Sequence, residues 1–251
     1  MKKVLVLGGS GFVGRHLCEA LNRRGIQVTV PTRRLPARSV QMLPFVTVVR
    51  ANVHDADSLR QLIAGHDAVV NLVAVLHGDE ARFGQLHVTL PTTVAQACLA
   101  AGVRRLVHVS ALGADLQGPS MYQRSKAQGE QALQSLASAQ GLALTVLRPS
   151  VIFGADDAFI NLFARLQKVF PLMPLASAGT RFQPVSVQDV ARALRALGLY
   201  QGGKGVAPFG GFFGVDVAQG RRLQGGHHHG EGQRCIHAST IPKPLPNEMP
   251  N

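Results

Sequence analysis

The stretch Gly8-Gly9-Ser10-Gly11-Phe12-Val13-Gly14 follows a short apolar run and precedes a segment whose apolar residues have helical spacing. In such a strand–turn–helix context, Gly8 permits a tight turn, Gly11 lets the backbone approach a pyrophosphate, and Gly14 lets the helix pack closely on the strand. The helix N-terminus then offers unpaired N–H groups and the positive end of its dipole to the phosphates. The stretch therefore predicts a dinucleotide-binding turn, and the alternative is a glycine turn with a structural role only.

The rest of residues 1–155 alternates short apolar runs with helical patterns. Predicted strands cover 3–7, 26–30, 45–50, 68–75, 105–110 and 142–148, and predicted helices cover 12–24, 57–64, 92–101 and 123–140. Several of the strand candidates are continuously apolar, which is typical of strands covered on both faces. The alternation indicates a parallel sheet with right-handed crossovers. We therefore expect an α/β fold, a doubly wound parallel sheet of the NAD(P)-binding Rossmann type, over residues 1–155.

The pattern changes towards the C-terminus. A very apolar helix is predicted over 157–170, followed by a strand over 182–187 and a helix over 189–197, so residues 156–198 are expected to form a small, incomplete substrate lobe. The apolar stripe of the first helix would pack in the core or cover a hydrophobic substrate. Residues 199–251 are rich in Gly and Pro and lose all periodicity, which favours a disordered tail. A reading-frame change near residues 198–201, or a truncated lobe, is our hypothesis for this break.

Composition excludes several classes of function. The longest apolar run, 68–76, contains Asn71 and is far shorter than the roughly 20 residues that span a bilayer. The net charge of +12 would allow contact with anionic surfaces, but the arginines are scattered in pairs without aromatic interleaving, so no specific nucleic-acid partner is expected. Three widely spaced cysteines and the His227–His229 run have no metal-ligand spacing, so no metal is expected. We expect a cytoplasmic chain, with peripheral contact at the inner membrane face as a further option.

The end of the second predicted strand distinguishes between the two nicotinamide coenzymes. An acid about 20 residues beyond the glycine turn would bind the ribose 2′-hydroxyl of NAD. Here the stretch is Pro31-Thr32-Arg33-Arg34-Leu35, without an acid. A guanidinium at Arg33 suits a 2′-phosphate by a bidentate, charge-assisted contact, whereas the alternative is a solvated loop pair. The sequence favours NADP(H) over NAD(H).

Tyr122 and Lys126 lie four residues apart, on one face of a predicted helix. A nearby ammonium group favours the phenolate and lowers the pKa of the phenol. Tyr122 could then donate or accept a proton beside a nicotinamide, while Lys126 could also bind the ribose hydroxyls. The pair is common by chance, and its place just after the fifth predicted strand makes it more specific.

Together, the glycine pattern and the Tyr122/Lys126 pair resemble the short-chain dehydrogenase/reductase superfamily, of its extended or atypical kind. Over about residues 2–198 the chain is similar to bacterial relatives of the alpha-subcomplex subunit 9 family of respiratory complex I, which is NAD-dependent epimerase/dehydratase-like. The segments that carry this likeness are 71–73, 108–115, 125–130, 148–154 and 183–191.

The resemblance implies a role for each matching residue. Those that would cradle the pyrophosphate and bind the 2′-phosphate are Gly8, Ser10, Gly11, Phe12, Val13 and Gly14, with Arg33 and Arg34. Those that would lie along the adenine, the middle of the cofactor and the nicotinamide are Asn52, Val53, Leu72, Val73, Ala74, Tyr122, Lys126, Pro149 and Val151. Ser110 is the candidate third catalytic residue, but the hydroxyl of active members aligns with Leu112, and its loss removes a hydrogen bond to the reacting oxygen.

Two functions of different classes follow as expectations. In the first, the protein transfers a hydride between nicotinamide and a carbonyl or alcohol carbon of a hydrophobic, quinone-related small molecule, with Tyr122 as acid or base. In the second, it is a non-catalytic NADPH-binding module that associates with respiratory or quinone-biosynthesis proteins. A redox-sensing transcriptional regulator of the same fold is less favoured, because such proteins usually lack the Tyr/Lys pair.

Overall fold

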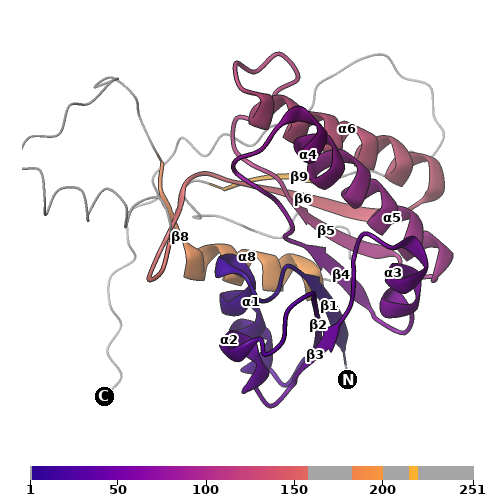
Figure 1. Cartoon of the computed structure of the whole chain (residues 1–251), viewed down its shortest axis with the longest axis vertical. Coiled ribbons are helices and arrows are strands. Elements are labelled where there is room, and N and C mark those ends of the chain that lie inside the picture. The colour runs from indigo at the N-terminus through magenta and orange to yellow at the C-terminus, as the bar shows by residue number, and fades with distance from the viewer. Residues whose placement is uncertain (1, 158–182, 200–214, 220–251) are drawn as a thin grey trace, which may run out of the picture.

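A parallel sheet lies at the centre of the structure, between two layers of helices (Figure 1). The computed structural model describes residues 2–157, 183–199 and 215–219. Six strands run parallel in the order β3-β2-β1-β4-β5-β6, which confirms the predicted doubly wound sheet. Their bounds are β1 Lys3–Leu7, β2 Gln27–Thr32, β3 Val46–Arg50, β4 Ala68–Asn71, β5 Arg105–Val109 and β6 Ala143–Pro149.

A seventh strand, β9 (Val215–Gln219), pairs antiparallel with β6 and forms the edge of the sheet. The expectation of a tail without regular structure from residue 199 is therefore wrong for these five residues. An isolated apolar alternation, Val215 and Val217, was too short to stand out in the Gly-rich surroundings. The remainder of the tail lies outside the described residues.

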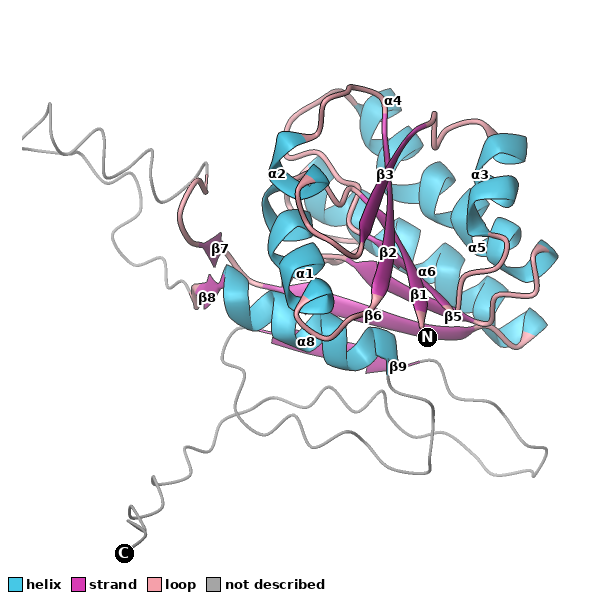
Figure 2. Cartoon of the chain, turned by 90° about the horizontal axis from the view of Figure 1, so that it is seen from below, coloured by secondary structure: helices cyan, strands magenta, loops and turns pink. Residues whose placement is uncertain are grey.

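Each face of the sheet has its own hydrophobic core, and β1 contributes to both. Val4 and Val6 pack with α1 and α8, whereas Leu5 and Leu7 pack with α3, α5 and α6. This explains why β1 is apolar at every position after Lys3, since successive side chains point to opposite faces. Figure 2 shows the helices on both sides of the strands. Their bounds are α1 Phe12–Asn22, α2 Arg38–Gln41, α3 Ala56–Ile63, α4 Glu80–Phe83, α5 Leu90–Ala100, α6 Met121–Gln140 and α8 Val187–Leu199.

The region between β4 and β5 differs most from the prediction. The strand ends at Asn71 rather than at residue 75, and the helical segment begins at α4, well before the predicted residue 92. Between α4 and α5 lies a π-helix, η1 (Gly84–Thr89). A π-helix inserts a residue into the helical repeat, so the 3.6-residue periodicity that reveals a helix in the sequence is lost there.

Near the C-terminus, β7 (Ile152–Phe153) and β8 (Val185–Ser186) form a separate parallel pair. The strand predicted over 182–187 is thus shorter, and α8 begins at Val187. The sequence assigns α8 to the substrate lobe, yet Val190 and Leu194 are buried in the same core as α1 and β1. The helix predicted over 157–170 lies outside the described residues. No helix in the described part of the chain has the length and apolarity that crossing a membrane requires.

Candidate functional site

The glycine turn between β1 and α1 has the geometry expected from its sequence. Gly8 has a φ of +80°, in the left-handed region that favours glycine, and its carbonyl oxygen accepts a 3.0 Å hydrogen bond from the Gly11 N–H. A Cβ on Gly14 would lie 2.3 Å from the Gly8 oxygen. The tight turn at Gly8 and the close packing at Gly14 are therefore confirmed. The approach of Gly11 to a pyrophosphate stays a prediction, and its exposed backbone leaves that approach open.

Beside this turn lies a cleft of about 790 Å³, within the range of cofactor pockets. It opens where β1, β2 and β4 end, which is where ligands bind in open α/β sheets. Seven of the predicted cofactor residues line it, namely Gly8, Ser10, Arg33, Arg34, Val53, Val73 and Ala74. These residues come from the loops after β1, β2, β3 and β4, so the fold brings together segments that are far apart in the sequence.

The other predicted cofactor residues do not line this cleft. They are Gly11, Phe12, Val13, Gly14, Asn52, Leu72, Tyr122, Lys126, Pro149 and Val151. Asn52 is exposed, and its side-chain oxygen accepts a 3.1 Å hydrogen bond from the His54 N–H, which shapes its own loop. Pro149 ends β6, and Val151 lies between β6 and β7, both at the carboxyl edge of the sheet.

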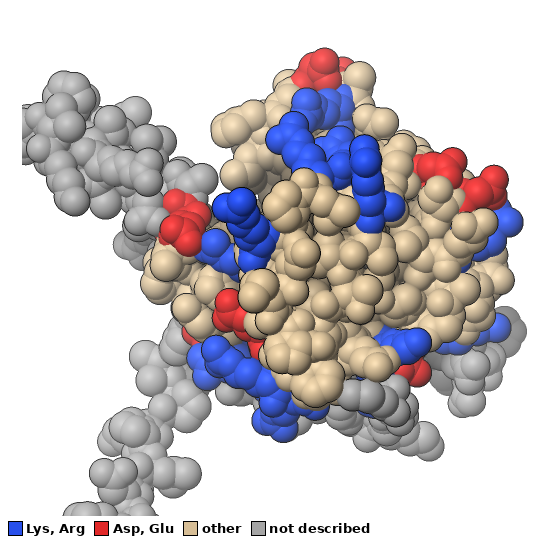
Figure 3. Space-filling view, turned by 60° about the horizontal axis from the view of Figure 1, so that its bottom comes forward, with Lys and Arg blue, Asp and Glu red and all other residues tan. Residues whose placement is uncertain are grey.

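Positive charge surrounds one end of the cleft. Arg33 and Arg34 follow β2, Arg38 lies in α2, and Arg82 reaches the cleft from α4, whereas no Asp or Glu is among the described residues that line it. Thr32 shapes this loop, because its Oγ1 accepts a 3.2 Å bond from the Arg34 N–H. In the space-filling view (Figure 3), several Lys and Arg side chains gather on one part of the visible surface. Sequence patterns did not indicate Arg38 and Arg82, because neither of the short helices that carry them, α2 and α4, was predicted.

Tyr122 and Lys126 both lie near the start of α6. The helix begins with a capping box, in which Ser120 and Gln123 satisfy each other's backbone N–H groups. The Lys126 Nζ donates a 2.9 Å hydrogen bond to the Val109 carbonyl oxygen at the end of β5. Its side chain is only 2% exposed, and this burial lowers the pKa of Lys126 to about 8, opposed by the nearby Glu130 carboxylate.

The expected lowering of the Tyr122 pKa is wrong in this structure. Burial disfavours the phenolate and raises the pKa of Tyr122, and this cause outweighs any attraction from Lys126. The Tyr122 ring packs edge-on against Phe83 and His87, with centroids 6.2 and 5.5 Å away. Tyr122 is therefore held as a neutral phenol, which can donate a proton.

Ser110 and Leu112 follow β5. The Ser110 Oγ is buried and has no hydrogen-bond partner among the described residues, although its backbone N–H donates to Leu147 at 2.8 Å. The Leu112 side chain is exposed. The unpartnered hydroxyl leaves Ser110 with a hydrogen bond to offer, but its burial restricts access to it.

Two buried polar groups next to Tyr122 and Lys126 were not predicted from the sequence. His87 bonds to Ser125, and Glu130 forms an ion pair with Arg148. His108 of β5 is buried, with its Nδ1 3.3 Å from the Asn71 amide nitrogen. In the sequence, His87 and His108 are both isolated histidines without the spacing of metal ligands. Nothing in the sequence therefore indicates that His87 lies beside Tyr122.

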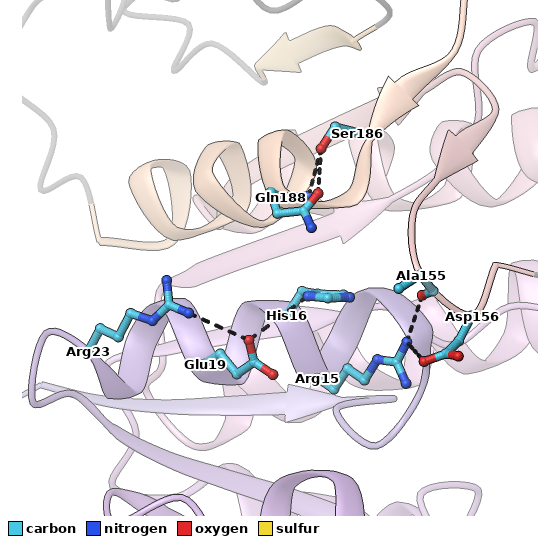
Figure 4. A network of polar contacts seen from close by, with 8 residues as sticks. All are labelled: Arg15, His16, Glu19, Arg23, Ala155, Asp156, Ser186 and Gln188. Carbon is cyan, nitrogen blue, oxygen red and sulfur yellow. Dashed lines mark hydrogen bonds and ion pairs between the residues drawn. The ribbon is translucent and has the colours of Figure 1, made fainter.

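Arg15 connects the glycine turn to the segment after β7 (Figure 4). Its Nη2 donates to the Ala155 carbonyl oxygen at 3.0 Å and lies 2.8 Å from an Asp156 carboxylate oxygen. The guanidinium also lies over the Phe12 ring, 5.7 Å from its centroid. The first turn of α1 thus holds the start of the segment that leaves the sheet.

Metal binding has no candidate in the part of the chain that the structure describes. Within residues 2–157, 183–199 and 215–219, no three His, Cys, Asp or Glu side chains lie close enough together to hold an ion.

A glycine turn, a cleft at the carboxyl edge of a β3-β2-β1-β4-β5-β6 sheet and a Tyr/Lys helix define an NAD(P)-binding protein of the extended short-chain dehydrogenase/reductase type. Residues 4–204 match the model of the NAD dependent epimerase/dehydratase family, and the chain belongs to this family. A nicotinamide dinucleotide is its typical cofactor.

Among its relatives is the mitochondrial NADH dehydrogenase (ubiquinone) 1 alpha subcomplex subunit 9 of Mus musculus, 36% identical over 199 residues, which are 75% of this chain and 51% of the mouse protein. Ceramide reductase of Caulobacter vibrioides is 29% identical over 194 residues, 77% of this chain and 60% of that enzyme. The chain spans about half the length of the subunit 9 relatives it matches.

Solved structures show the same fold. The UDP-glucose 4-epimerase of Thermus thermophilus, in complex with NAD, superposes with a TM-score of 0.68 over 79% of this chain and 75% of that one. The two sequences are 23% identical, so the likeness concerns the fold alone.

Proposed function

We propose that the protein transfers a hydride between NADP(H) and a carbonyl or alcohol carbon of an apolar substrate. The observation that carries this proposal is the pair at the start of α6: a neutral, partly buried Tyr122 phenol and a buried Lys126 whose ammonium is bound to the end of β5. A protein that only held a coenzyme could use Lys126 to bind the ribose hydroxyls, but it would need no proton donor at the position of Tyr122.

The residues present fit a phosphorylated dinucleotide. The glycine turn would bind the pyrophosphate. Gly11 is exposed, so its backbone can approach the phosphates, and the lack of a Cβ at Gly14 allows the tight packing that places the helix N-terminus there. Arg33 with Arg34 would hold the 2′-phosphate, and Val73 and Ala74 would line the middle of the coenzyme. The cluster of arginines without a carboxylate supports NADP(H) over NAD(H), since an acid at this end would repel the extra phosphate.

In the direction of reduction, Tyr122 donates its phenolic proton to the carbonyl oxygen while the carbonyl carbon receives the hydride. When bound, the coenzyme supplies that hydride, or accepts it in the reverse direction. The Lys126 charge stabilises the phenolate that remains, which solvent then reprotonates. Ser110 is the candidate for orienting the substrate oxygen, because its buried hydroxyl is free to donate a hydrogen bond.

The expected substrate is apolar. Leu76 follows β4, Leu112 and Leu116 follow β5, and Met121 precedes Tyr122, and all four side chains are exposed at this carboxyl edge. Large exposed apolar side chains near a candidate site favour a hydrophobic ligand. The name of one relative, ceramide reductase, points to a lipid as substrate for that enzyme.

Turnover of NADPH with a panel of long-chain ketones, aldehydes and quinones tests the proposal. The wild-type protein should oxidise NADPH with at least one of them, and Tyr122→Phe should reduce the rate by a factor of about 100 or more. Equal rates for the two proteins would remove Tyr122 from the mechanism and contradict the proposal.

A non-catalytic NADPH-binding module is the second candidate. Leu112 favours it, because the family resemblance implies a hydroxyl at this position in active members, and so does the similarity to a complex I subunit. Such a module would associate with a respiratory or quinone-biosynthesis assembly at the inner face of a membrane. Tight NADPH binding with no turnover on any carbonyl would decide for it.

A further inference from the structure

The π-helix η1 brings His87 against α6. His87 is 1% exposed, and η1 packs closely against α6. A Cβ on Gly129 of α6 would lie 1.9 Å from the His87 carbonyl oxygen, so only glycine allows this approach. Single-turn π-helices occur frequently at functional sites, and here the π-turn sets the position of one buried histidine.

The hydrogen bonds of His87 determine where its proton lies. The Val75 N–H donates to Nε2 at 3.2 Å, and a backbone N–H can only donate, so Nε2 is the acceptor. Nδ1 therefore carries the proton and donates to the Ser125 Oγ at 2.9 Å. The Ser125 hydroxyl in turn donates to the Tyr122 carbonyl oxygen at 2.9 Å. One chain of bonds thus runs from Val75 to Tyr122.

This chain joins the two halves of the site. Val75 belongs to the loop after β4, whose residues Val73 to Val75 line the coenzyme cleft, while Tyr122 lies in the first turn of α6. The His87 ring also packs edge-on against the Tyr122 ring, at 85° and 5.5 Å between centroids. Tyr122 is thus held by His87 through its backbone and through its ring.

The groups that face His87 keep it neutral. Burial and the positive charge of Lys126 lower the pKa of His87 to about 4. His108 adds no charge of its own, because burial holds its pKa well below the ordinary value. Both nitrogen atoms of His87 therefore keep their separate roles as donor and acceptor at neutral pH.

We propose that neutral His87 is a positioning residue, which couples the coenzyme-lining loop after β4 to Tyr122 and so places the phenol for proton transfer. The proposal rests on the proposed function, in which Tyr122 is the proton donor. Displacing a catalytic group by about 1 Å can cost roughly 100-fold in rate, so the effect should appear in kcat.

The first test compares His87→Leu with His87→Gln. Leucine fills the space but makes no hydrogen bond, whereas the glutamine amide offers an NH2 donor and a carbonyl acceptor, as the neutral imidazole offers one donor and one acceptor. We expect His87→Leu to lower kcat by about 10- to 100-fold with a smaller change in KM for NADPH, and His87→Gln to recover most of that loss. Wild-type kcat in His87→Leu, or no recovery in His87→Gln, would overturn the proposal.

His66 provides a matched control. His66 is half-buried and, like His87, uses one ring nitrogen for a hydroxyl and the other for a backbone group. Its partners are Thr29 Oγ1 at 2.8 Å and Ile63 O at 3.2 Å, and it follows α3 at the opposite end of the strands. His66→Leu should destabilise the fold and leave kcat unchanged. An equal fall of kcat in His66→Leu would mean that the loss in His87→Leu reports stability only, which contradicts the proposal.

Nitrogen-15 NMR of the full chain tests the linkage without relying on activity. Between about pH 5.5 and 8, His87 should show the neutral tautomer protonated at Nδ1, and both Ser125→Ala and added NADPH should shift its signals. An imidazolium, or a proton at Nε2, would overturn the proposal. If the wild-type protein turns over no carbonyl, the proposed function fails, and the NMR result still decides whether His87 links Val75 to Tyr122.

Discussion

The Lys126 ammonium donates a 2.9 Å hydrogen bond to the Val109 carbonyl oxygen and thereby joins α6 to the end of β5. The charge is almost completely buried, and Glu130, one turn further along α6, forms an ion pair with Arg148 of β6. Lys126 thus has two roles: it links helix α6 to the sheet, and it places a buried charge one helical turn from Tyr122. Its desolvation brings its pKa to about 8, close to physiological pH.

The buried lysine predicts a distinctive dependence of stability on pH. The folded protein releases the Lys126 proton near pH 8, whereas the unfolded chain keeps it until the ordinary pKa of 10.5. The unfolded state binds more protons in between, so stability rises with pH in this window. From pH 8 to about 9.5 the free energy of unfolding should gain about 2 kcal/mol in the wild type relative to Lys126→Met. The free energies of unfolding can be measured by urea titration at each pH. If they change with pH in parallel in the two proteins, the prediction is contradicted.

The arginines of the cleft predict coenzyme preference. Arg33→Ala should weaken NADPH binding by about 10- to 100-fold, the effect of one charge-assisted hydrogen bond, and should leave NADH binding nearly unchanged. Arg60→Ala is the control, because Arg60 is an exposed arginine in α3 outside the cleft that pairs with Asp57. Equal weakening of NADPH and NADH in Arg33→Ala, measured by fluorescence titration, would refute the 2′-phosphate assignment.

Two glycine substitutions should separate an effect on coenzyme binding from an effect on the stability of the fold. In Gly14→Ala the new Cβ would meet the Gly8 oxygen at 2.3 Å, so the turn must shift and coenzyme affinity should fall at least tenfold. Gly25→Ala makes a useful comparison, since its Cβ would meet nothing within 4 Å and only the positive φ of +65° is strained. That variant should lose about 1 kcal/mol of stability and bind NADPH normally. Normal binding in Gly14→Ala would show that the turn does not act as argued.

Arg15 predicts a local effect on the segment after β7. Arg15→Ala removes the bond to Ala155 and the contact with Asp156, which together should cost about 1 kcal/mol because the arginine is only partly exposed. Hydrogen exchange of amides 154–157 should become faster. Arg23, whose side chain is 79% exposed and 3.9 Å from Glu19, is the control and should show neither effect. Unchanged hydrogen exchange of these amides in Arg15→Ala would show that Arg15 does not stabilise the segment after β7.

Much of the fold could be predicted because local and tertiary preferences agree in it. The strands that are buried on both faces are apolar at nearly every position, and Gly25, Gly65, Gly102 and Gly141 end helices or their turns with positive φ. The region from residue 80 to 91 could not be predicted in this way. There a π-helix disrupts the periodicity, and Pro91 near the start of α5 reads as a helix breaker although it lies in a helical segment.

The residues of the candidate site also form two groups, those that the sequence could predict and those that depend on tertiary contacts. Gly8, Ser10, Arg33 and Arg34 follow directly after predicted strands, so the sequence placed them at the carboxyl edge where the cleft lies. Arg82 and His87 depend on α4 and η1, and their approach to the site is a tertiary contact that no spacing reveals. The sign of the Tyr122 pKa shift was wrong for a related reason: it depends on burial by Phe83 and His87, which sequence proximity to Lys126 does not report.

Calorimetric titration of the full chain with NADPH and NADH tests the central claim most directly, namely that the glycine turn and the basic cleft bind a phosphorylated nicotinamide dinucleotide. We expect saturable binding of NADPH, at least tenfold tighter than that of NADH. Absence of binding by folded protein for both coenzymes, up to roughly millimolar concentration, would contradict it.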